Sequence, residues 1–271
     1  MTFGELLKKK WNEQKFVCVN LDPVIEKLPP SIADKDTEEA LFVFTQNIVD
    51  KTADLVCAFK PNSAFYEAYG ESGARALSRI ASYIHETYPD MPTILDAKRG
   101  DIGHTNEMYA KNVFDELGFG AVTVHPYLGR DSLEPFLERK EKGVFVLSKT
   151  SNSGSGEFQD MNVNGEKLYE HVARNVAEEW NKNGNCGVVA GATHPEELAH
   201  VRKIVGDMPI LIPGIGAQGG SARESFIAGK NKEEAGVLLA VGRSVIYASS
   251  GEDYADAARS EVEKLSQSTR S

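Results

Sequence analysis

The sequence predicts an α/β fold, a (β/α)8 or TIM barrel that forms a single domain over residues 1–271. Eight short apolar runs recur along the whole chain, and their starts lie 22 to 43 residues apart, which leaves room for a helix after each run. The early strand-to-helix turns lack the GxGxxG pattern of an open, doubly wound sheet. A count of eight parallel strands therefore favours closure into a barrel.

The predicted strands are rich in Val, Ile, Leu and Phe, and Gly, Pro, Asn or Asp residues bound them. In chain order they are FVCVNLD from residue 16, LVCAFKPN from 55, PTILDAKR from 92, AVTVHP from 121, GVFVLSKT from 143, CGVVAGAT from 186, PILIPGIG from 209 and AGVLLAVGRS from 235. Alternation of such runs with helix-length segments is the β/α repeat.

The segments between strands carry the i, i+3, i+7 apolar stripe of amphipathic helices. The stripes are Leu41, Phe44 and Ile48; Leu77, Ile80 and Ile84; and Leu198, Val201 and Val205. Before the last of these, Thr193 and Glu196 have the spacing of a capping box, with Pro195 in the first turn. A helical extension precedes the first strand. A final helix near 254 to 266 is expected to bury Tyr254, Ala258, Val262 and Leu265.

The composition favours a protein that handles small molecules. Hydrophobic residues make up 41% of the chain, the net charge is -10, and the sequence pI is about 5.2, which argues against nucleic acid or an anionic membrane as partner. No apolar run suits a signal peptide or a membrane span, so a cytoplasmic location is expected. Cys18, Cys57 and Cys186 lie in apolar runs without metal-binding spacing, which predicts buried, reduced thiols.

Polar residues gather at the ends of the predicted strands, where barrel enzymes carry their chemistry. They are Asp22, Lys60, Asp96, Lys98, His125, Lys149, Ser151 and Arg243. Any one of them alone is equally well explained by a strand that ends in solvent. Because all of these polar residues are expected at the same end of the barrel, together they predict an active site there.

Glycine-rich turns follow the last two strands and predict a phosphate site. PGIGAQGG at 213 to 220 and VGRS at 241 to 244 let backbone N–H groups approach phosphate oxygens. Arg243 offers a bidentate guanidinium and Gln218 an amide donor. The alternative is a tight turn with a surface arginine. A phosphorylated small molecule is the expected ligand.

A charged array is predicted across strands 2 and 3. Asp96 and Lys98 are two residues apart on one strand and share its inward face, while Lys60 comes from the neighbouring strand. Asp101 follows in the turn, where Gly100 permits a tight bend. Two acids and two lysines in one small space are costly to desolvate, so the array indicates chemistry in which a carbanion forms. An ion-pair network without catalysis is the alternative.

The segment DAKRGDIGHTNEMYA contains the DxKxxD pattern and resembles the orotidine 5'-phosphate decarboxylase family, particularly its longer-chain (type 2) subfamily. Other motifs of that family occur here in the family's order: FKPN, SNSGSGEFQ, PGIGAQGG and VGRS. The resemblance covers residues 16 to 247. It implies a carboxy-lyase that converts orotidine 5'-phosphate to uridine 5'-phosphate (UMP) with release of CO2, the last step of de novo pyrimidine biosynthesis, without a metal or organic cofactor.

The resemblance also implies a role for each matching residue. Lys98 is similar to the proton donor to C6, Asp96 to the acid near the substrate carboxylate, and Lys60 to the lysine that completes the array. Asp101 and Thr105 are similar to residues that reach the partner subunit's site in a homodimer. The remaining matches concern the substrate: Asp22 for the ribose hydroxyls, Ser151 for the pyrimidine edge, and Gln218 and Arg243 for the phosphate.

His104 departs from the family pattern, which often has Asn there. His125 and Lys149 are taken as structural, and Phe65, Tyr66 and Tyr69 as helix packing. The polar loop 151–165 is expected to close over the substrate. Two alternatives stay open: a magnesium-dependent enzyme of the hexulose-phosphate synthase group, which carries an acid where this chain has Lys60, and a noncatalytic phosphate-binding barrel.

Overall fold

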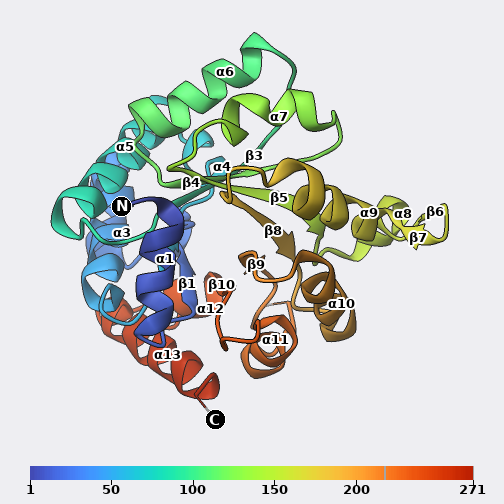
Figure 1. The fold of residues 1–271 in the computed structure, drawn as a ribbon. Helices are drawn as coiled ribbons and strands as arrows, with labels where there is room; N and C mark the ends of the chain where they lie inside the picture. Colours follow the sequence, from blue (N-terminus) through green and yellow to red (C-terminus); the bar gives the residue numbers. More distant parts are fainter. Residues whose placement is uncertain (217, 271) are drawn as a thin grey trace.

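The computed structural model describes residues 1–216 and 218–270 and has the predicted architecture, with parallel strands inside and helices outside (Figure 1). Ala217, within the glycine-rich segment 213–220, lies outside these residues. The barrel strands are β1 (Val17–Asn20), β2 (Ala58–Lys60), β3 (Ile94–Arg99), β4 (Ala121–Val124), β5 (Gly143–Lys149), β8 (Cys186–Ala190), β9 (Ile210–Ile212) and β10 (Val237–Val241). Each lies within one predicted run, so the fold class is confirmed.

The strands close into a barrel. Their order in the sheet is β2-β1-β10-β9-β8-β5-β4-β3, and the neighbouring strands pair in parallel. The two end strands meet through parallel bridges from Phe59 to Thr93 and from Asn62 to Asp96. The carboxyl ends of all the strands therefore surround one opening.

The longer helices bury the predicted stripes. They are α1 (Phe3–Asn12), α3 (Thr37–Thr52), α5 (Gly70–Thr87), α6 (His104–Lys111), α7 (Arg130–Leu137), α9 (Leu168–Asn175), α10 (Pro195–Val205), α11 (Ala222–Gly229) and α13 (Tyr254–Ser268). The predicted stripes of α3, α5 and α10 are buried, as are Tyr254, Ala258 and Val262 of α13, whereas Leu265 is partly buried.

Short elements complete the chain. The four-residue helices are α2 (Pro30–Ala33), α4 (Ala64–Glu67), α8 (Gly156–Gln159) and α12 (Arg243–Ile246), and 3-10 turns cover Ile25–Lys27 and Ser153–Ser155. Helices α6 and α9 continue as π-helical turns over Asn112–Glu116 and Val176–Trp180. A small antiparallel hairpin of β6 (Asn162–Val163) and β7 (Glu166–Lys167) follows α8 and projects from the barrel (Figure 1).

The start of α10 differs from the prediction. Its N-cap residue is His194, no side chain caps it, and the Thr193 hydroxyl is buried without a hydrogen-bond partner among the described residues. Thr193 lies one residue before the N-cap position, so its hydroxyl does not serve the amide that a capping box requires. The predicted box with Glu196 is therefore wrong, whereas Pro195 in the first turn is confirmed.

Both terminal helices pack on the barrel. Helix α1 covers the end where the strands begin: the rings of Phe3 and Phe145 lie 5.9 Å apart, and Trp11 Nε1 donates to the Val237 carbonyl at 2.9 Å. At the side of the barrel, the ring of Tyr254 in α13 stacks 4.9 Å from Phe44 of α3. The end opposite α1 is left for the site.

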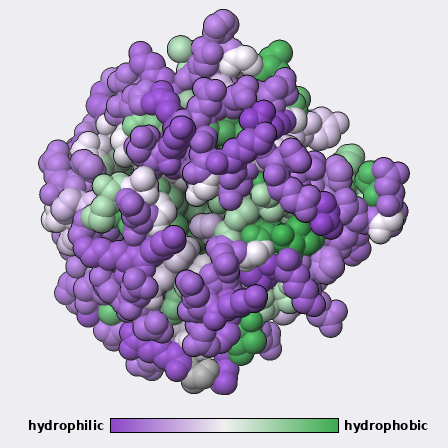
Figure 2. All heavy atoms as spheres, viewed as in Figure 1, coloured by the Kyte–Doolittle hydropathy of each residue, from purple (hydrophilic) through white to green (hydrophobic). Residues whose placement is uncertain are grey.

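The face shown in Figure 2 is mostly hydrophilic, while the apolar side chains fill the interior. The three cysteines are buried and free, as predicted, and burial raises the pKa of Cys18 to about 12. None of the helices in the described ranges has the length and apolar character needed to cross a bilayer. That the chain forms one domain stays a prediction.

Candidate active site

A cavity of about 550 Å³ lies at the carboxyl ends of the strands. Every barrel strand contributes to its wall, through Asn20, Lys60, Asp96, Lys98, Thr123, Leu147, Val189, Leu211 and Ala240. Of the residues that the sequence predicts for the site, the lining includes Asp22, Lys60, Asp96, Lys98, Ser151, Gln218 and Arg243. These residues come from segments spread over most of the chain, and barrel closure brings them together.

The Asp96 carboxylate is the centre of the charged array. Its Oδ2 accepts a hydrogen bond from Lys60 Nζ at 2.7 Å, and its Oδ1 accepts bonds from Lys98 Nζ at 2.6 Å and Thr123 Oγ1 at 2.9 Å. Asn62 Nδ2 adds a longer contact of 3.4 Å to Oδ2. Burial alone would raise the pKa of Asp96, but Lys60 and Lys98 outweigh it and hold the pKa well below its usual range.

Asp22 and Lys60 extend the array to β1 and β2. Asp22 Oδ1 accepts the backbone N–H of Asn62 at 3.0 Å, yet burial raises the pKa of Asp22 in spite of that bond and of Lys60. For Lys60, desolvation acts to lower the pKa, but the carboxylates of Asp96 and Asp22 outweigh it and raise the pKa. Lys60 is therefore a buried ammonium held between two carboxyl groups.

The backbone of β3 is irregular at the array. The register with β4 shifts between Leu95 and Arg99, and Lys98 has a φ of 46°, in the left-handed region that residues other than glycine seldom adopt. Asp96 and Lys98 both face the cavity, as predicted, but a regular two-residue alternation is not the reason. The bulge turns both side chains toward the cavity. A strained φ such as that of Lys98 is typical of functional sites.

Gly100 also has a different function from the one predicted. Its φ is not positive, but a Cβ at Gly100 would lie 2.2 Å from His125 Nε2. His125 Nε2 is 3.1 Å from the Gly100 carbonyl oxygen, which agrees with a structural role for this histidine. The glycine is therefore needed for the close approach of the imidazole, and not for a tight bend.

The glycine-rich turn after β9 lies against the loop after β5. Gly214 has a φ of 97°, and a Cβ there would lie 2.9 Å from the Ser151 Cβ and 3.1 Å from Gln218 Oε1. Arg243 begins α12 directly after Gly242, and its guanidinium has no ion-pair partner within the described ranges. The backbone N–H groups of Gly216, Gly219 and Gly220 bond within the turn itself, so the group that suits this part of the cavity to an anion is the Arg243 guanidinium.

Asp101 and Thr105 do not line the cavity. Asp101 Oδ1 accepts the N–H of Ile102 at 2.8 Å, and Asn106 holds the backbone of Asp101 by hydrogen bonds at both its N–H and its carbonyl. Thr105 is exposed, and Ile102 and Met108 nearby are 65% and 59% exposed. Both predicted residues thus lie outside the cavity that this chain forms by itself.

The cavity includes residues that the sequence did not single out. Asn20, Asn62, Thr123 and Gln159 contribute polar groups to its wall. Phe65, which was expected from the sequence to serve helix packing, packs on the core and also lines the cavity. FKPN, which ends in Asn62, was recognised only as a motif. Thr123 lies inside an apolar strand, where nothing in the sequence distinguishes it from a core threonine.

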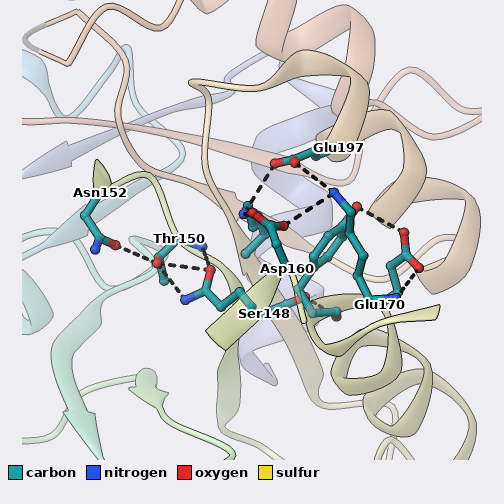
Figure 3. A network of polar contacts seen from close by, with 10 residues as sticks. Ser148, Thr150, Asn152, Asp160, Glu170 and Glu197 are labelled. Carbon is teal, nitrogen blue, oxygen red and sulfur yellow. Dashed lines mark hydrogen bonds and ion pairs between the residues drawn. The ribbon is translucent and has the colours of Figure 1, made fainter. Parts of the chain in front are cut away.

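A network of polar contacts anchors the loop after β5 (Figure 3). The Lys149 side chain is 5% exposed, and its Nζ donates to both carboxylate oxygens of Asp160 at 2.9 Å and lies 3.8 Å from Glu197 Oε2. One residue earlier in the loop, Gln159 Oε1 accepts the Thr150 N–H at 2.9 Å. Lys149 lies outside the cavity lining, whereas Thr150, Asn152 and Gln159 line it, so the network fixes a loop that forms part of the cavity wall.

The sequence model of the orotidine 5'-phosphate decarboxylase / HUMPS family matches residues 16–258. The chain belongs to this family. An orotidine 5'-phosphate decarboxylase of Janthinobacterium sp. (strain Marseille) is 48% identical over 260 residues, 96% of this chain and 94% of that protein. One of Cellvibrio japonicus is 45% identical over 268 residues, 98% of this chain and 97% of that protein.

A solved structure agrees with the family assignment. The chain superposes on the OMP decarboxylase of Leishmania donovani with a TM-score of 0.86 and 36% identity, covering 100% of both chains. The expectation that the chain is an enzyme of the carboxy-lyase class is confirmed. Among residues 1–216 and 218–270, no group of three or more His, Cys, Asp and Glu side chains is arranged to hold a metal ion.

Proposed function

We propose that this enzyme decarboxylates orotidine 5'-phosphate to UMP in the last step of de novo pyrimidine biosynthesis, in the cytoplasm and without a metal or organic cofactor. The observation that carries the proposal is the Lys60–Asp96–Lys98 array, which lies at the carboxyl ends of β2 and β3 and faces the cavity. Full-length similarity to orotidine 5'-phosphate decarboxylases supports the choice of substrate.

The two lysines of the array are suited to different tasks. The Lys60 side chain is 3% exposed and held by buried carboxyl groups, whereas the Lys98 side chain is 48% exposed and faces open space. In the proposed reaction, the bond from C6 to the carboxylate breaks, CO2 leaves with the electron pair remaining on C6, and the Lys98 ammonium gives a proton to that carbon. Asp96 lies beside the departing carboxylate and holds Lys98 in reach.

The other lining residues are proposed to bind the nucleotide. Arg243 and Gln218 bind the phosphate beside the glycine-rich turn, and Ser151 contacts the pyrimidine edge. Asp22 and Lys60 bind the ribose. A cavity of about 550 Å³ is large enough for a mononucleotide.

We further propose a homodimer in which Asp101 and Thr105 complete the site of the partner subunit. Their position outside the cavity of their own chain, next to the exposed Ile102 and Met108, supports this arrangement. The test mixes two variants, Lys98→Ala and Asp101→Ala, each expected to be inactive alone. Subunit exchange would create sites with both wild-type residues and restore part of the activity, whereas no recovery would contradict a shared site.

The rival enzyme on this scaffold is less well supported by the site. Hexulose-phosphate synthase-like members use magnesium held by an acid on strand 2, and this chain has the buried ammonium of Lys60 there, bonded to Asp96. A divalent cation beside that ammonium would be repelled. A noncatalytic binding barrel is also disfavoured, because it has no need for Lys98 in a strained backbone.

The decisive experiment follows the loss of orotidine 5'-phosphate ultraviolet absorbance with purified protein in the presence of a chelator. Decay that is unaffected by the chelator is expected, and absence of decay would contradict the proposed function. Lys98→Ala is expected to lose nearly all turnover, while Lys264→Ala, at a side chain 71% exposed on α13, retains it. Near-normal turnover of Lys98→Ala would remove the assignment of the proton donor.

A further inference from the structure

The bulge in β3 leaves one residue of β4 opposite three residues of β3. Leu95 pairs with Val122 and Arg99 pairs with Val124, so the segment from Asp96 to Lys98 lies across from Thr123 alone. A bulge of this kind removes regular ladder hydrogen bonds at the point where it occurs. Backbone groups within it must find another partner, because buried N–H groups without one are costly.

Thr123 supplies that partner through its side chain. Its hydroxyl oxygen accepts the Lys98 backbone N–H at 3.0 Å and donates its own proton to Asp96 Oδ1 at 2.9 Å. Thr123 is 1% exposed, so water does not compete strongly for either bond. One hydroxyl thus joins the backbone of the proposed proton donor to the carboxylate beside it.

The two bonds act at the strained point of the strand. Lys98 has a φ of 46°, a conformation that needs support from its surroundings, and the bond to its N–H fixes the peptide from which the side chain starts. The other bond fixes Asp96 Oδ1, the same oxygen that accepts Lys98 Nζ at 2.6 Å. Both ends of the Lys98 side chain therefore depend on the position of Thr123.

We propose that Thr123 is a positioning residue for decarboxylation, which holds Lys98 and Asp96 in the geometry that proton transfer to C6 requires. The inference rests on the proposed function for its effect on turnover, but its structural part does not. A hydroxyl is needed here because it is both an acceptor and a donor. Valine has the same shape and neither capacity, whereas serine keeps both and loses only a methyl group.

Thr93 provides a matched control between the same two strands. It directly precedes β3, and its hydroxyl accepts the backbone N–H of Gly120, directly before β4, at 3.2 Å. Thr93 is 9% exposed and lies at the barrel end opposite the cavity. Thr93→Val therefore removes a comparable hydrogen bond between β3 and β4 without touching the array.

The experiment compares wild type, Thr123→Val, Thr123→Ser and Thr93→Val. For Thr123→Val we expect kcat to fall by about tenfold or more, with the Kd for UMP changed by less than about threefold, because the lost bonds orient the reacting groups. Thr123→Ser and Thr93→Val should both keep most of the wild-type kcat. If circular dichroism shows that Thr123→Val does not fold, Thr123→Ala takes its place in the comparison.

A second measurement does not depend on activity. Hydrogen exchange of the Lys98 amide should be at least about tenfold faster in Thr123→Val than in wild type and unchanged in Thr93→Val. Wild-type kcat in Thr123→Val, equal losses in Thr123→Ser, or unchanged exchange at Lys98 would each overturn the proposal. An inactive wild-type protein with the expected exchange pattern would contradict the proposed function and leave the positioning role supported.

Discussion

Replacement of Lys60 by methionine tests whether the array is a compensated group of buried charges. Lys60 is 3% exposed, and its Nζ lies 2.7 Å from Asp96 Oδ2, with Asp22 close enough to raise its pKa. Methionine fills a similar volume but leaves both carboxyl groups without this cation. Removal of one partner of a buried ion pair costs about 3–5 kcal/mol, so we expect a loss of that size in the free energy of unfolding at pH 7.

The pH dependence of this loss has a definite sign. Without Lys60, the pKa values of Asp96 and Asp22 rise, and for Asp22 burial already raises the pKa above its usual value. A group whose pKa is higher in the folded than in the unfolded protein favours folding when it binds a proton. The deficit of Lys60→Met relative to wild type should therefore shrink as the pH falls from about 7 to about 5.

Urea denaturation followed by circular dichroism measures both effects. Lys9→Met is the control, since Lys9 pairs with Asp90 on the surface with side chains 46% and 44% exposed, and it should resemble wild type. Addition of Asp96→Asn to Lys60→Met should recover part of the stability, because it removes a buried carboxylate that has lost one of its two lysine partners. The reasoning is refuted by a Lys60→Met variant as stable as the control at pH 7, or by a deficit that grows on acidification.

Asp22→Asn should leave the free energy of unfolding at pH 7 unchanged or raised, because burial raises the pKa of Asp22 and a neutral amide avoids the cost of a buried charge. Turnover of orotidine 5'-phosphate should fall. Urea titration measures the first effect and the absorbance assay the second. Arg202→Met should cost about 3–5 kcal/mol in urea titration, since the buried guanidinium donates to the carbonyls of Gly229, Gly206, Met208 and Gly236. Limited proteolysis should show protection of 151–165 by a nucleotide inhibitor; equal cleavage would contradict loop closure.

The barrel could be predicted from the sequence because its signal is local. Each strand is a continuous apolar run ended by Gly, Pro, Asn or Asp, and each of the predicted stripes in α3, α5 and α10 is buried. The position of Lys60, Asp96 and Lys98 at one cavity followed from the rule that strand ends meet. These features depend on residue type and spacing alone.

The remaining details depend on register between strands, which no single segment encodes. The bulge that aims Lys98 is visible only once β3 is paired with β4, and the same pairing turns Thr123 from a core residue into a partner of Asp96. The need for Gly100 arises from His125, which directly follows another strand, β4. For Thr193, a shift of one residue in the start of α10 was enough to remove the predicted cap.

The pairing of β1 with β10 has a consequence for how the chain reaches this structure. β1 is synthesised well before β10, so one of its edges stays open until residues 237–241 emerge, and Trp11 Nε1 lacks its acceptor, the Val237 carbonyl, until then. Contacts over such sequence distances slow folding, since a long loop must close before they form. The nascent chain therefore exposes an apolar strand edge until β10 is made, and such an unpaired edge is prone to aggregation.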